Sequence, residues 1–214
     1  MTDVSSDDRV AAALRAISLI DLTDLSDDHA HTGIEALCAR ALAHGTAAVC
    51  VWPEYVSRCS SELSGSDVRV ATVVNFPSGE RPLSQVAAMT HGALDDGADD
   101  IDVVLPYRAF LAGDLATAAT MISKVTSAVH APRIVKVILE TGALGDADTI
   151  RAAADLAIEN GADFVKTSTG KIPAGASLDA ATAMLAAISA ADRSVGIKPS
   201  GGIRTFEEAL QYIG

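Results

Sequence analysis

Short apolar runs rich in β-branched residues recur along the chain, and each has about the length of one β-strand. They are nearly continuous in apolar character instead of alternating with polar residues, which is typical of parallel strands buried on both faces. Seven such runs are present, at residues 16–22, 46–52, 68–76, 99–105, 133–140, 163–169 and 194–200. The pattern predicts a parallel sheet in the interior of the protein.

Segments with helical periodicity, rich in alanine and leucine, separate these runs. The clearest of them span residues 83–97, 114–129, 146–161 and 178–190, and several end at a glycine, which suits a helix C-terminus. The tripeptide Gly-Ala-Asp at residues 97–99 recurs at 161–163, which is 64 residues later. Strand and helix therefore alternate as copies of one unit.

Equal modules without a linker favour one domain over residues 1–214, an α/β TIM barrel of the (β/α)8 type. Seven strand–helix modules are visible, so we expect the eighth βα unit to be missing from this chain of 214 residues. A flavodoxin-like or Rossmann sheet is the alternative, but the sequence G-x-G-x-x-G is absent after the first strand. Thr205 and Glu208 have the spacing of a capping box, which predicts a seventh helix after them.

The open end of such a barrel leads to a further expectation. We expect the natural reading frame to continue for about 30 to 40 residues, enough for one more βα unit. Without that unit the first and seventh strands have unpaired edges, and the neighbouring helices expose apolar faces. If the chain is complete, a partner subunit must fill the gap.

The chain is acidic, with 16 basic against 28 acidic side chains and a formal charge of −12. This charge repels nucleic acid phosphates and anionic lipid head groups, so neither is an expected partner. Apolar residues make up 49% of the sequence, which indicates a folded, soluble protein. No stretch approaches the roughly 18 apolar residues of a membrane-spanning helix, and the N-terminus is acidic, so we expect a cytoplasmic location.

Charged residues interrupt the apolar strands at corresponding positions of the modules. The 64-residue offset between repeated modules gives Asp102 and Lys166 equivalent positions in their modules. The 52-residue offset between Gly45 and Gly97 gives Cys50 the same position in its own module. Alternate strands of a barrel supply one interior layer, so we expect these three side chains to share a layer. The charged residues of the odd strands, expected in a neighbouring layer, are Asp21, Lys136 and Lys198.

Three lysines within apolar strands need a reason, because burial of an unpaired charge is costly. One interpretation is a structural ion network of Lys136, Lys166 and Lys198 with Asp21, Asp102 and Glu140. The other, which we favour, is a catalytic amine whose pKa is lowered by a neighbouring ammonium, since only a neutral amine attacks a carbonyl. This chemistry is Schiff-base formation, with Asp102 as the proton carrier and Asp21 as its relay.

Two glycine-rich segments, at residues 166–171 and 198–204, follow strands and lead towards helices. Each offers backbone N–H groups, a basic side chain and a helix N-terminus, which are the features that bind phosphate. Barrels of this type bind phosphate at the loops after their last strands. The alternative is that Gly170, Gly201 and Gly202 only permit turns.

Metal and thiol chemistry have less support. His29 and His31 are separated by one residue, but no further His, Cys or Glu follows at ligand spacing, so no metal site is predicted. Three cysteines without a C-x-x-C pair are expected to be free thiols. We interpret Cys50 as a packing residue at the edge of the site, because no histidine has an equivalent position to act as its base.

Seven long motifs follow one another over nearly the whole chain: SLIDLTDL, AAVCVWP, VATVVNFPSG, DIDVVLPYRAFLAGD, KVILETGAL, GADFVKTSTGK and GIKPSGGIRT. In these motifs and in their order the chain resembles the deoxyribose-phosphate aldolases, which are class I, Schiff-base aldolases. The resemblance implies cleavage of 2-deoxy-D-ribose 5-phosphate into D-glyceraldehyde 3-phosphate and acetaldehyde. It implies no metal and no diffusible cofactor, and the expected partners are this phosphorylated sugar and acetaldehyde, with a homodimer left open.

The resemblance also implies roles for single residues. Lys166 corresponds to the Schiff-base lysine, Asp102 to the proton-transfer acid and base, and Lys198 to a second lysine that perturbs Lys166. The substrate-binding positions are Asp21, Thr23, Cys50, Lys136 and Thr169. The phosphate-binding positions are Gly170, Lys171, Gly201, Gly202 and Arg204.

The chain departs from the family at its end, where another helix and an eighth strand with a Gly-x-Ser-Ser-like phosphate loop are expected. Three functions therefore stay open. They are an aldolase for deoxyribose phosphate, a C-terminally truncated barrel that is inactive or binds a phosphometabolite, and another Schiff-base aldolase. Borohydride reduction with acetaldehyde, followed by mass spectrometry, separates the first from the second.

Overall fold

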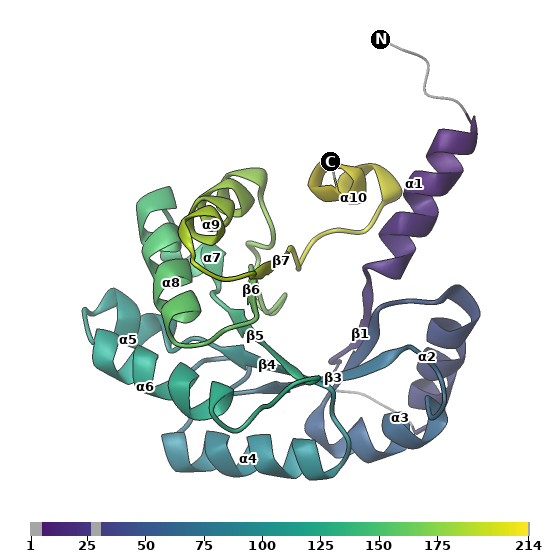
Figure 1. The fold of residues 1–214 in the computed structure, drawn as a ribbon, viewed down its shortest axis with the longest axis horizontal. Coiled ribbons are helices and arrows are strands. Elements are labelled where there is room, and N and C mark those ends of the chain that lie inside the picture. Colours follow the sequence, from purple (N-terminus) through teal and green to yellow (C-terminus); the bar gives the residue numbers. More distant parts are fainter. Residues whose placement is uncertain (1–5, 27–30, 214) are drawn as a thin grey trace.

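The computed structural model describes residues 6–26 and 31–213. Its centre is one parallel sheet in which seven strands pair in chain order. The strands are β1 (Asp21–Asp24), β2 (Ala48–Val51), β3 (Arg69–Val74), β4 (Asp100–Val104), β5 (Ile134–Ile138), β6 (Phe164–Lys166) and β7 (Gly196–Lys198). The sheet curls, and the helices that connect its strands lie on the outer side (Figure 1).

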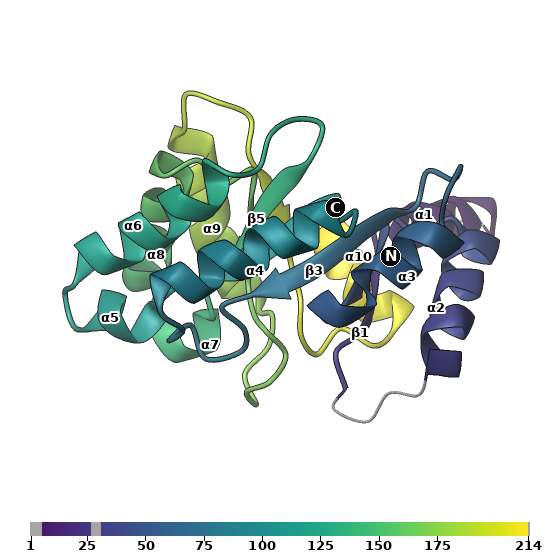
Figure 2. The ribbon, with the colours of Figure 1, turned by 90° about the horizontal axis from the view of Figure 1, so that it is seen from below.

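The helices alternate with the strands, as the repeated unit predicts. They are α1 (Ser6–Ser18), α2 (His31–His44), the short 3-10 helix η1 (Pro53–Tyr55), α3 (Val56–Glu62), α4 (Leu83–Asp95), α5 (Tyr107–Leu111), α6 (Leu115–Thr126), α7 (Thr141–Leu144), α8 (Ala147–Glu159), α9 (Leu178–Ala190) and α10 (Phe206–Ile213). Figure 2 shows α4 crossing the outer side of the sheet beside β3. The four segments with predicted helical periodicity are confirmed as α4, α6, α8 and α9.

The sheet has two edges, β1 and β7, which are not paired with each other in the described part of the chain. Helices α1 and α10 face each other beside this opening (Figure 1), and Arg9 of α1 forms an ion pair of 3.1 Å with Glu207 of α10. The prediction of an α/β barrel of TIM type with seven strand–helix modules is thereby confirmed. No eighth strand is present within residues 6–26 and 31–213.

The first predicted strand has the wrong start. Residues 16–18 form the last turn of α1, and β1 begins only at Asp21. The N–H of Leu19 donates to the carbonyl of Ala16 at 3.1 Å, so the chain turns before it becomes extended. An apolar run of this length fits a helix end as well as a strand, and periodicity alone does not separate the two.

The capping box predicted at the start of the last helix is confirmed. The Thr205 hydroxyl accepts the N–H of Glu208 at 3.2 Å, and the Glu208 carboxylate accepts the N–H of Thr205 at 3.0 Å. The N–H of Arg204 donates to the same carboxylate at 2.7 Å. Because these donors, Arg204 first among them, stabilise the charged form, the pKa of Glu208 is lowered.

Alternation along β4 (Asp100–Val104) directs its two charged side chains to the inner face of the sheet. Successive side chains of a strand point to opposite faces, so Ile101 of β4 packs towards the helices while Asp100 and Asp102 point into the barrel. The parallel register places Asp102 directly opposite Lys136 of β5. The charged residues therefore meet in the interior of the barrel.

Three remaining sequence predictions concern metals, thiols and membranes. His29 lies outside the described residues, and in the described part no group of three or more His, Cys, Asp or Glu is arranged to hold a metal ion. Cys38, Cys50 and Cys59 are buried free thiols. None of the described helices has the length and apolar character needed to cross a membrane.

Candidate active site

Five charged side chains of alternating sign form a chain through the interior of the barrel. In order, they are Arg69 of β3, Asp100 of β4, Lys136 of β5, Asp102 of β4 and Lys166 of β6. Each of the two carboxylates contacts a cation on either side. The structure thus contains an ion network of the kind that the sequence predicts, although its members differ in part.

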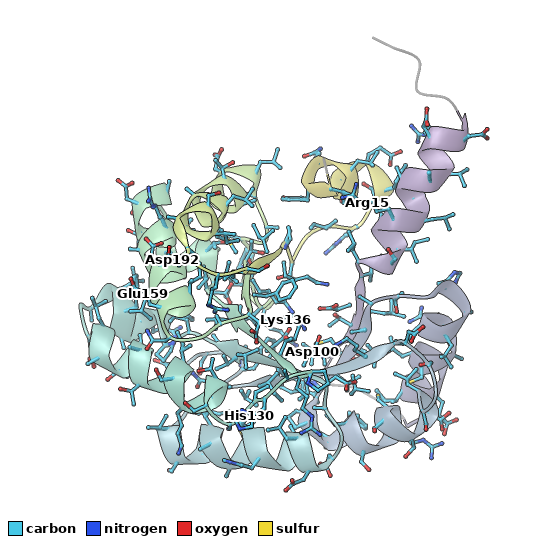
Figure 3. The ribbon with its side chains drawn as sticks, in the orientation of Figure 1. Arg15, Asp100, His130, Lys136, Glu159 and Asp192 are labelled. Carbon is cyan, nitrogen blue, oxygen red and sulfur yellow. The ribbon has the colours of Figure 1, made fainter. Side chains whose placement is uncertain are left out.

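Lys136 is the centre of this chain. Its ammonium donates to Oδ2 of Asp100 at 2.7 Å and to Oδ1 of Asp102 at 2.9 Å, and a third carboxylate oxygen, of Asp21, lies 3.6 Å away. Figure 3 shows Lys136 and Asp100 near each other on the inner side of the sheet. Burial alone lowers the pKa of Lys136, but the carboxylates outweigh it, led by Asp102, and raise the pKa.

Asp102 connects Lys136 to Lys166. Its second oxygen, Oδ2, accepts a hydrogen bond from Nζ of Lys166 at 2.6 Å, and its side chain is 0% exposed. Burial alone raises the pKa of Asp102, but the two ammonium groups outweigh it and hold the pKa at about 2. Burial likewise lowers the pKa of Lys166, and contact with Asp102 outweighs this and raises it. In this resting arrangement the acid is ionised and the amine is protonated.

The prediction that a neighbouring ammonium leaves Lys166 with a lowered pKa is therefore wrong, since the pKa of Lys166 is raised. Lys198 pairs with Asp21, whose Oδ1 lies 2.7 Å from its ammonium, and it donates to the carbonyl of Leu19 at 2.8 Å. Lys136 opposes protonation of Lys166 directly, and its repulsion is weaker than the attraction of the Asp102 carboxylate. A carboxylate in direct contact favours the ammonium form.

One further prediction for the network is wrong. Glu140 takes no part in it, because its carboxylate accepts a hydrogen bond from the Thr169 hydroxyl at 2.5 Å, while burial raises its pKa. Its expected place beside a lysine is taken by Asp100. The two expected layers are in contact with each other, since Lys136 of β5 bonds directly to Asp102 of β4.

A cavity of about 1010 Å³ lies inside the barrel and collects most of the predicted residues. Those that line it are Asp21, Thr23, Lys136, Lys166, Thr169, Gly170, Lys171, Lys198, Gly201 and Arg204. Cys50 and Asp102 do not line the cavity, and both are 0% exposed. Burial raises the pKa of Cys50 to about 12, so its thiol is not ionised near neutral pH. Gly202 lines a separate pocket of about 160 Å³.

The two predicted phosphate loops are joined to each other by short contacts. The Thr167 hydroxyl donates to the carbonyl of Ser200 at 2.9 Å and accepts the Ser200 N–H at 2.8 Å. Gly175 approaches Gly201 so closely that a Cβ at residue 175 would lie 2.2 Å from the Gly201 carbonyl oxygen. Gly201 has a φ of +84°, which favours glycine. These glycines therefore serve the loop geometry, and their binding of phosphate stays a prediction.

Lys171 connects the loop after β6 to the loop after β1. Its ammonium donates to the carbonyl of Leu25 at 2.7 Å and lies 5.7 Å from the centre of the Trp52 ring. The indole N–H of Trp52 in turn donates to the carbonyl of Ser26 at 3.0 Å. These contacts lie at the carboxyl ends of the strands, where barrel enzymes carry their active sites.

Sequence reasoning missed Arg69, Asp100 and Ser200. Asp100 has a usable signal, because it lies two positions before Asp102 in one strand and such residues point to the same face. Arg69 has no comparable signal, since it reaches Asp100 on the neighbouring strand only after the sheet has formed. The same holds for Ser200, whose partner Thr167 lies 33 positions earlier.

Comparison with known proteins adds an independent line of evidence. Residues 15–213 match the family model described as DeoC/LacD family aldolase. The chain belongs to the DeoC/LacD aldolase family. It is also 50% identical over 209 residues to a deoxyribose-phosphate aldolase from Agrobacterium fabrum, a match that covers 96% of this chain and 80% of the relative.

Solved structures agree with this family assignment. QR15, described as an aldolase, has a TM-score of 0.85 and 30% identity, and the match covers 100% of this chain and 88% of QR15. The tetrameric deoxyribose-phosphate aldolase from Aeropyrum pernix has a TM-score of 0.82 and 27% identity, with 96% of this chain and 88% of that protein covered. This DeoC/LacD family member is thus an enzyme of the aldolase class, a carbon–carbon lyase.

Proposed function

We propose that this aldolase cleaves 2-deoxy-D-ribose 5-phosphate into D-glyceraldehyde 3-phosphate and acetaldehyde, and forms it in reverse, through a Schiff base on Lys166. One observation carries the proposal: Lys166 lines the cavity while its ammonium lies 2.6 Å from the buried carboxylate of Asp102. An amine that faces a substrate cavity and touches a proton acceptor has what Schiff-base chemistry needs. The name of the Agrobacterium fabrum relative supports the choice of substrate.

The reaction begins when the Lys166 amine loses a proton and attacks the C1 aldehyde carbon of the open-chain sugar. The resulting carbinolamine loses water and becomes an iminium ion. Removal of the proton from the C3 hydroxyl then breaks the C2–C3 bond, which releases D-glyceraldehyde 3-phosphate and leaves an enamine on Lys166. Protonation of C2 and hydrolysis release acetaldehyde and restore the amine. Asp102 carries the protons, since it is in hydrogen-bond contact with Lys166.

The resting ion pair sets the first requirement of this mechanism. The pKa of Lys166 is raised by Asp102, so the attacking form of the amine is scarce before substrate arrives. Substrate binding has to break the contact between Lys166 and Asp102, or the proton has to pass along it. Either route predicts that the rate of Schiff-base formation increases with pH.

Asp21 supplies a second polar position on the cavity wall. Its Oδ1 is bound to Lys198, whereas its Oδ2 is buried, lies 3.6 Å from the Lys136 ammonium and accepts no hydrogen bond from the residues that the structure describes. A buried acceptor that lacks a hydrogen bond is costly, even with a cation 3.6 Å away. We assign this oxygen to a hydroxyl group of the sugar or to the water that the reaction releases and consumes. Thr23, which also lines the cavity, lies on the same strand.

We place the phosphate group of the substrate against the loops after β6 and β7. Gly170, Lys171, Gly201 and Arg204 line the cavity there and offer backbone N–H groups and two cations. The Thr169 hydroxyl is already bonded to Glu140, so we assign it to holding the loop rather than to the substrate. We assign no substrate contact to Gly202, which lines the smaller pocket, or to Cys50, which is buried. Both residues shape the site.

Borohydride trapping tests the proposal directly. Reduction in the presence of acetaldehyde should leave one two-carbon adduct per chain, on the peptide that contains Lys166. Lys166→Arg, which keeps the charge but not the nucleophile, should abolish the adduct, whereas replacement of the exposed Lys124 by Met should leave it unchanged. An adduct on Lys136 or Lys198, or none, would contradict the mechanism. A preference for a keto acid over acetaldehyde would favour another Schiff-base aldolase.

A further inference from the structure

Asp100 is a buried carboxylate that the proposed reaction does not use. It is 2% exposed, and its two oxygens have different partners. Oδ1 accepts a hydrogen bond from Nε of Arg69 at 2.7 Å, and Oδ2 accepts one from the ammonium of Lys136, also at 2.7 Å. Arg69 is anchored further by hydrogen bonds to the carbonyls of Asp99 and Pro132. Asp100 is therefore held between a cation at the start of β3 and the central cation of the network.

Asp100 and Asp102 compete for Lys136. The Lys136 ammonium lies 2.7 Å from the Asp100 carboxylate and 2.9 Å from the Asp102 carboxylate, so its single charge is divided between them. A cation that two carboxylates share neutralises neither of them completely. Without a charge on Asp100, Lys136 would act on Asp102 alone at contact distance. Asp102 would then be a weaker acceptor for the proton of Lys166.

We propose that Asp100 is a positioning residue for the aldolase reaction: by holding Lys136, it keeps Asp102 able to exchange a proton with Lys166. Arg69 has the opposite effect to Asp100, because it neutralises part of the negative charge with which Asp100 holds Lys136. Asp100 acts on the reacting groups through Lys136. The inference rests on the proposed function, since it requires Lys166 as the reacting amine.

The other groups that act on Lys166 are known from the structure. They come from β1, β2, β4 and β5 and are Asp21, Cys50, Asp102 and Lys136. Lys198 of β7 is bound to Asp21. Neither Asp100→Asn nor Arg69→Gln replaces any of these groups, so a change in the pH dependence of Lys166 reports on how the Arg69–Asp100 pair acts through Lys136.

Two substitutions, one at each end of this ion pair, should act in opposite directions. Asp100→Asn removes a negative charge, so the pH midpoint of Schiff-base formation should fall by about one unit. In the same variant kcat should fall about tenfold, because Asp102 is less basic, with KM changed less than about twofold. Arg69→Gln removes the opposing cation, strengthens the hold of Asp100 on Lys136 and should move the midpoint to higher pH.

The measurements are borohydride trapping of acetaldehyde on Lys166 as a function of pH, and steady-state kinetics with 2-deoxy-D-ribose 5-phosphate. Asp99→Asn is the matched control, because it removes the same charge one position earlier, where the carboxylate accepts the N–H of Val70 at 2.9 Å. It should not move the midpoint. Asp100→Glu restores the charge and should bring the midpoint back towards that of the natural protein. Thermal unfolding of each variant shows whether it is folded.

A shift in the same direction for Asp100→Asn and Arg69→Gln, or no shift in either, overturns the inference. So does a shift in Asp99→Asn as large as that in Asp100→Asn. If Asp100→Asn does not fold, Arg69→Gln alone must raise the midpoint and Asp100→Glu must preserve it, and failure of either result overturns the inference. Absence of a Schiff base on Lys166 in the natural protein would instead contradict the proposed function.

Discussion

Lys136 of β5 lies directly opposite Asp102 of β4 in the parallel register, and their side chains meet at 2.9 Å. The same ammonium also holds Asp100 and faces Asp21. Its side chain is only 4% exposed, so solvent cannot take over its role in neutralising three acidic groups. Stability and chemistry of the site therefore both depend on Lys136.

Lys136→Met should destabilise the folded protein by about 3–5 kcal/mol, because it leaves buried carboxylates without their shared cation. Urea unfolding at pH 7 measures the change in the free energy of unfolding. Lys124→Met is the control: this lysine is exposed on α6, and its replacement should change the free energy by less than about 0.5 kcal/mol. Equal effects of the two substitutions would show that the network contributes little to stability.

Lys198→Leu should reduce activity at pH 7 about tenfold and recover part of it at alkaline pH. The reason is its ion pair of 2.7 Å with Asp21: without Lys198, the charge of Asp21 acts more fully on Lys166 and favours its protonated form. Lys198→Arg keeps the charge and should lose much less. The measurement is the pH profile of kcat, and identical profiles for Lys198→Leu and the natural protein would contradict the prediction.

Much of the fold could be predicted from the sequence, because parallel strands buried on both faces produce apolar runs. Six of the seven predicted strands contain the observed ones, from β2 to β7. The first failed at its start, since residues 16–18 belong to α1 and have the same apolar character as a strand. The periodicity of so short a run does not distinguish a helix end from a strand.

For the site, the sequence predicted several of the residues that belong to it but not how they pair with one another. Module offsets singled out Asp102 and Lys166, which do bond to each other at 2.6 Å. The sign of the pKa change of Lys166 could not be predicted, because it depends on which carboxylate contacts which lysine. Such contacts follow from register and side-chain packing, as with Lys198, which pairs with Asp21.

The lowered pKa of Asp102 should make stability depend on pH in acid. This pKa is about 2 in the folded protein, against about 3.9 for an aspartate in an unfolded chain. Because the folded value is the lower one, the contribution is fully present above about pH 3.9 and is lost as the pH falls through about 2. It amounts to about 2–3 kcal/mol. Urea unfolding between pH 5 and pH 2 should show a smaller loss of stability for Asp102→Asn than for the natural protein.

Cys50 should react with thiol reagents only when the protein unfolds. It is 0% exposed, and burial raises its pKa to about 12, so the reactive thiolate is scarce at pH 8. Iodoacetamide labelling followed by peptide mass spectrometry should find Cys50 unmodified in the native protein and modified in urea. Rapid labelling under native conditions would show that the strand β2 opens, or that Cys50 faces the cavity.

Gly175→Ala should weaken binding of the phosphorylated substrate. A Cβ at this position would lie 2.2 Å from the carbonyl oxygen of Gly201, which also accepts the N–H of Ala176 at 2.9 Å. The loop after β7 has to move away, while Lys166 and Asp102 keep their contact. We expect KM for 2-deoxy-D-ribose 5-phosphate to rise about tenfold, the equivalent of about 1.4 kcal/mol, with a much smaller change in kcat.

The control for this prediction is Gly33→Ala. Gly33 lies within α2, and a Cβ there meets nothing within 4 Å, so the substitution should preserve KM and stabilise the helix by up to about 1 kcal/mol. A second comparison uses 2-deoxy-D-ribose, which has no phosphate. Since the displaced loop is assigned to the phosphate, Gly175→Ala should leave kcat/KM for this sugar nearly unchanged. An equal loss for both sugars would mean that residues 198–204 hold the reacting end of the substrate instead of its phosphate.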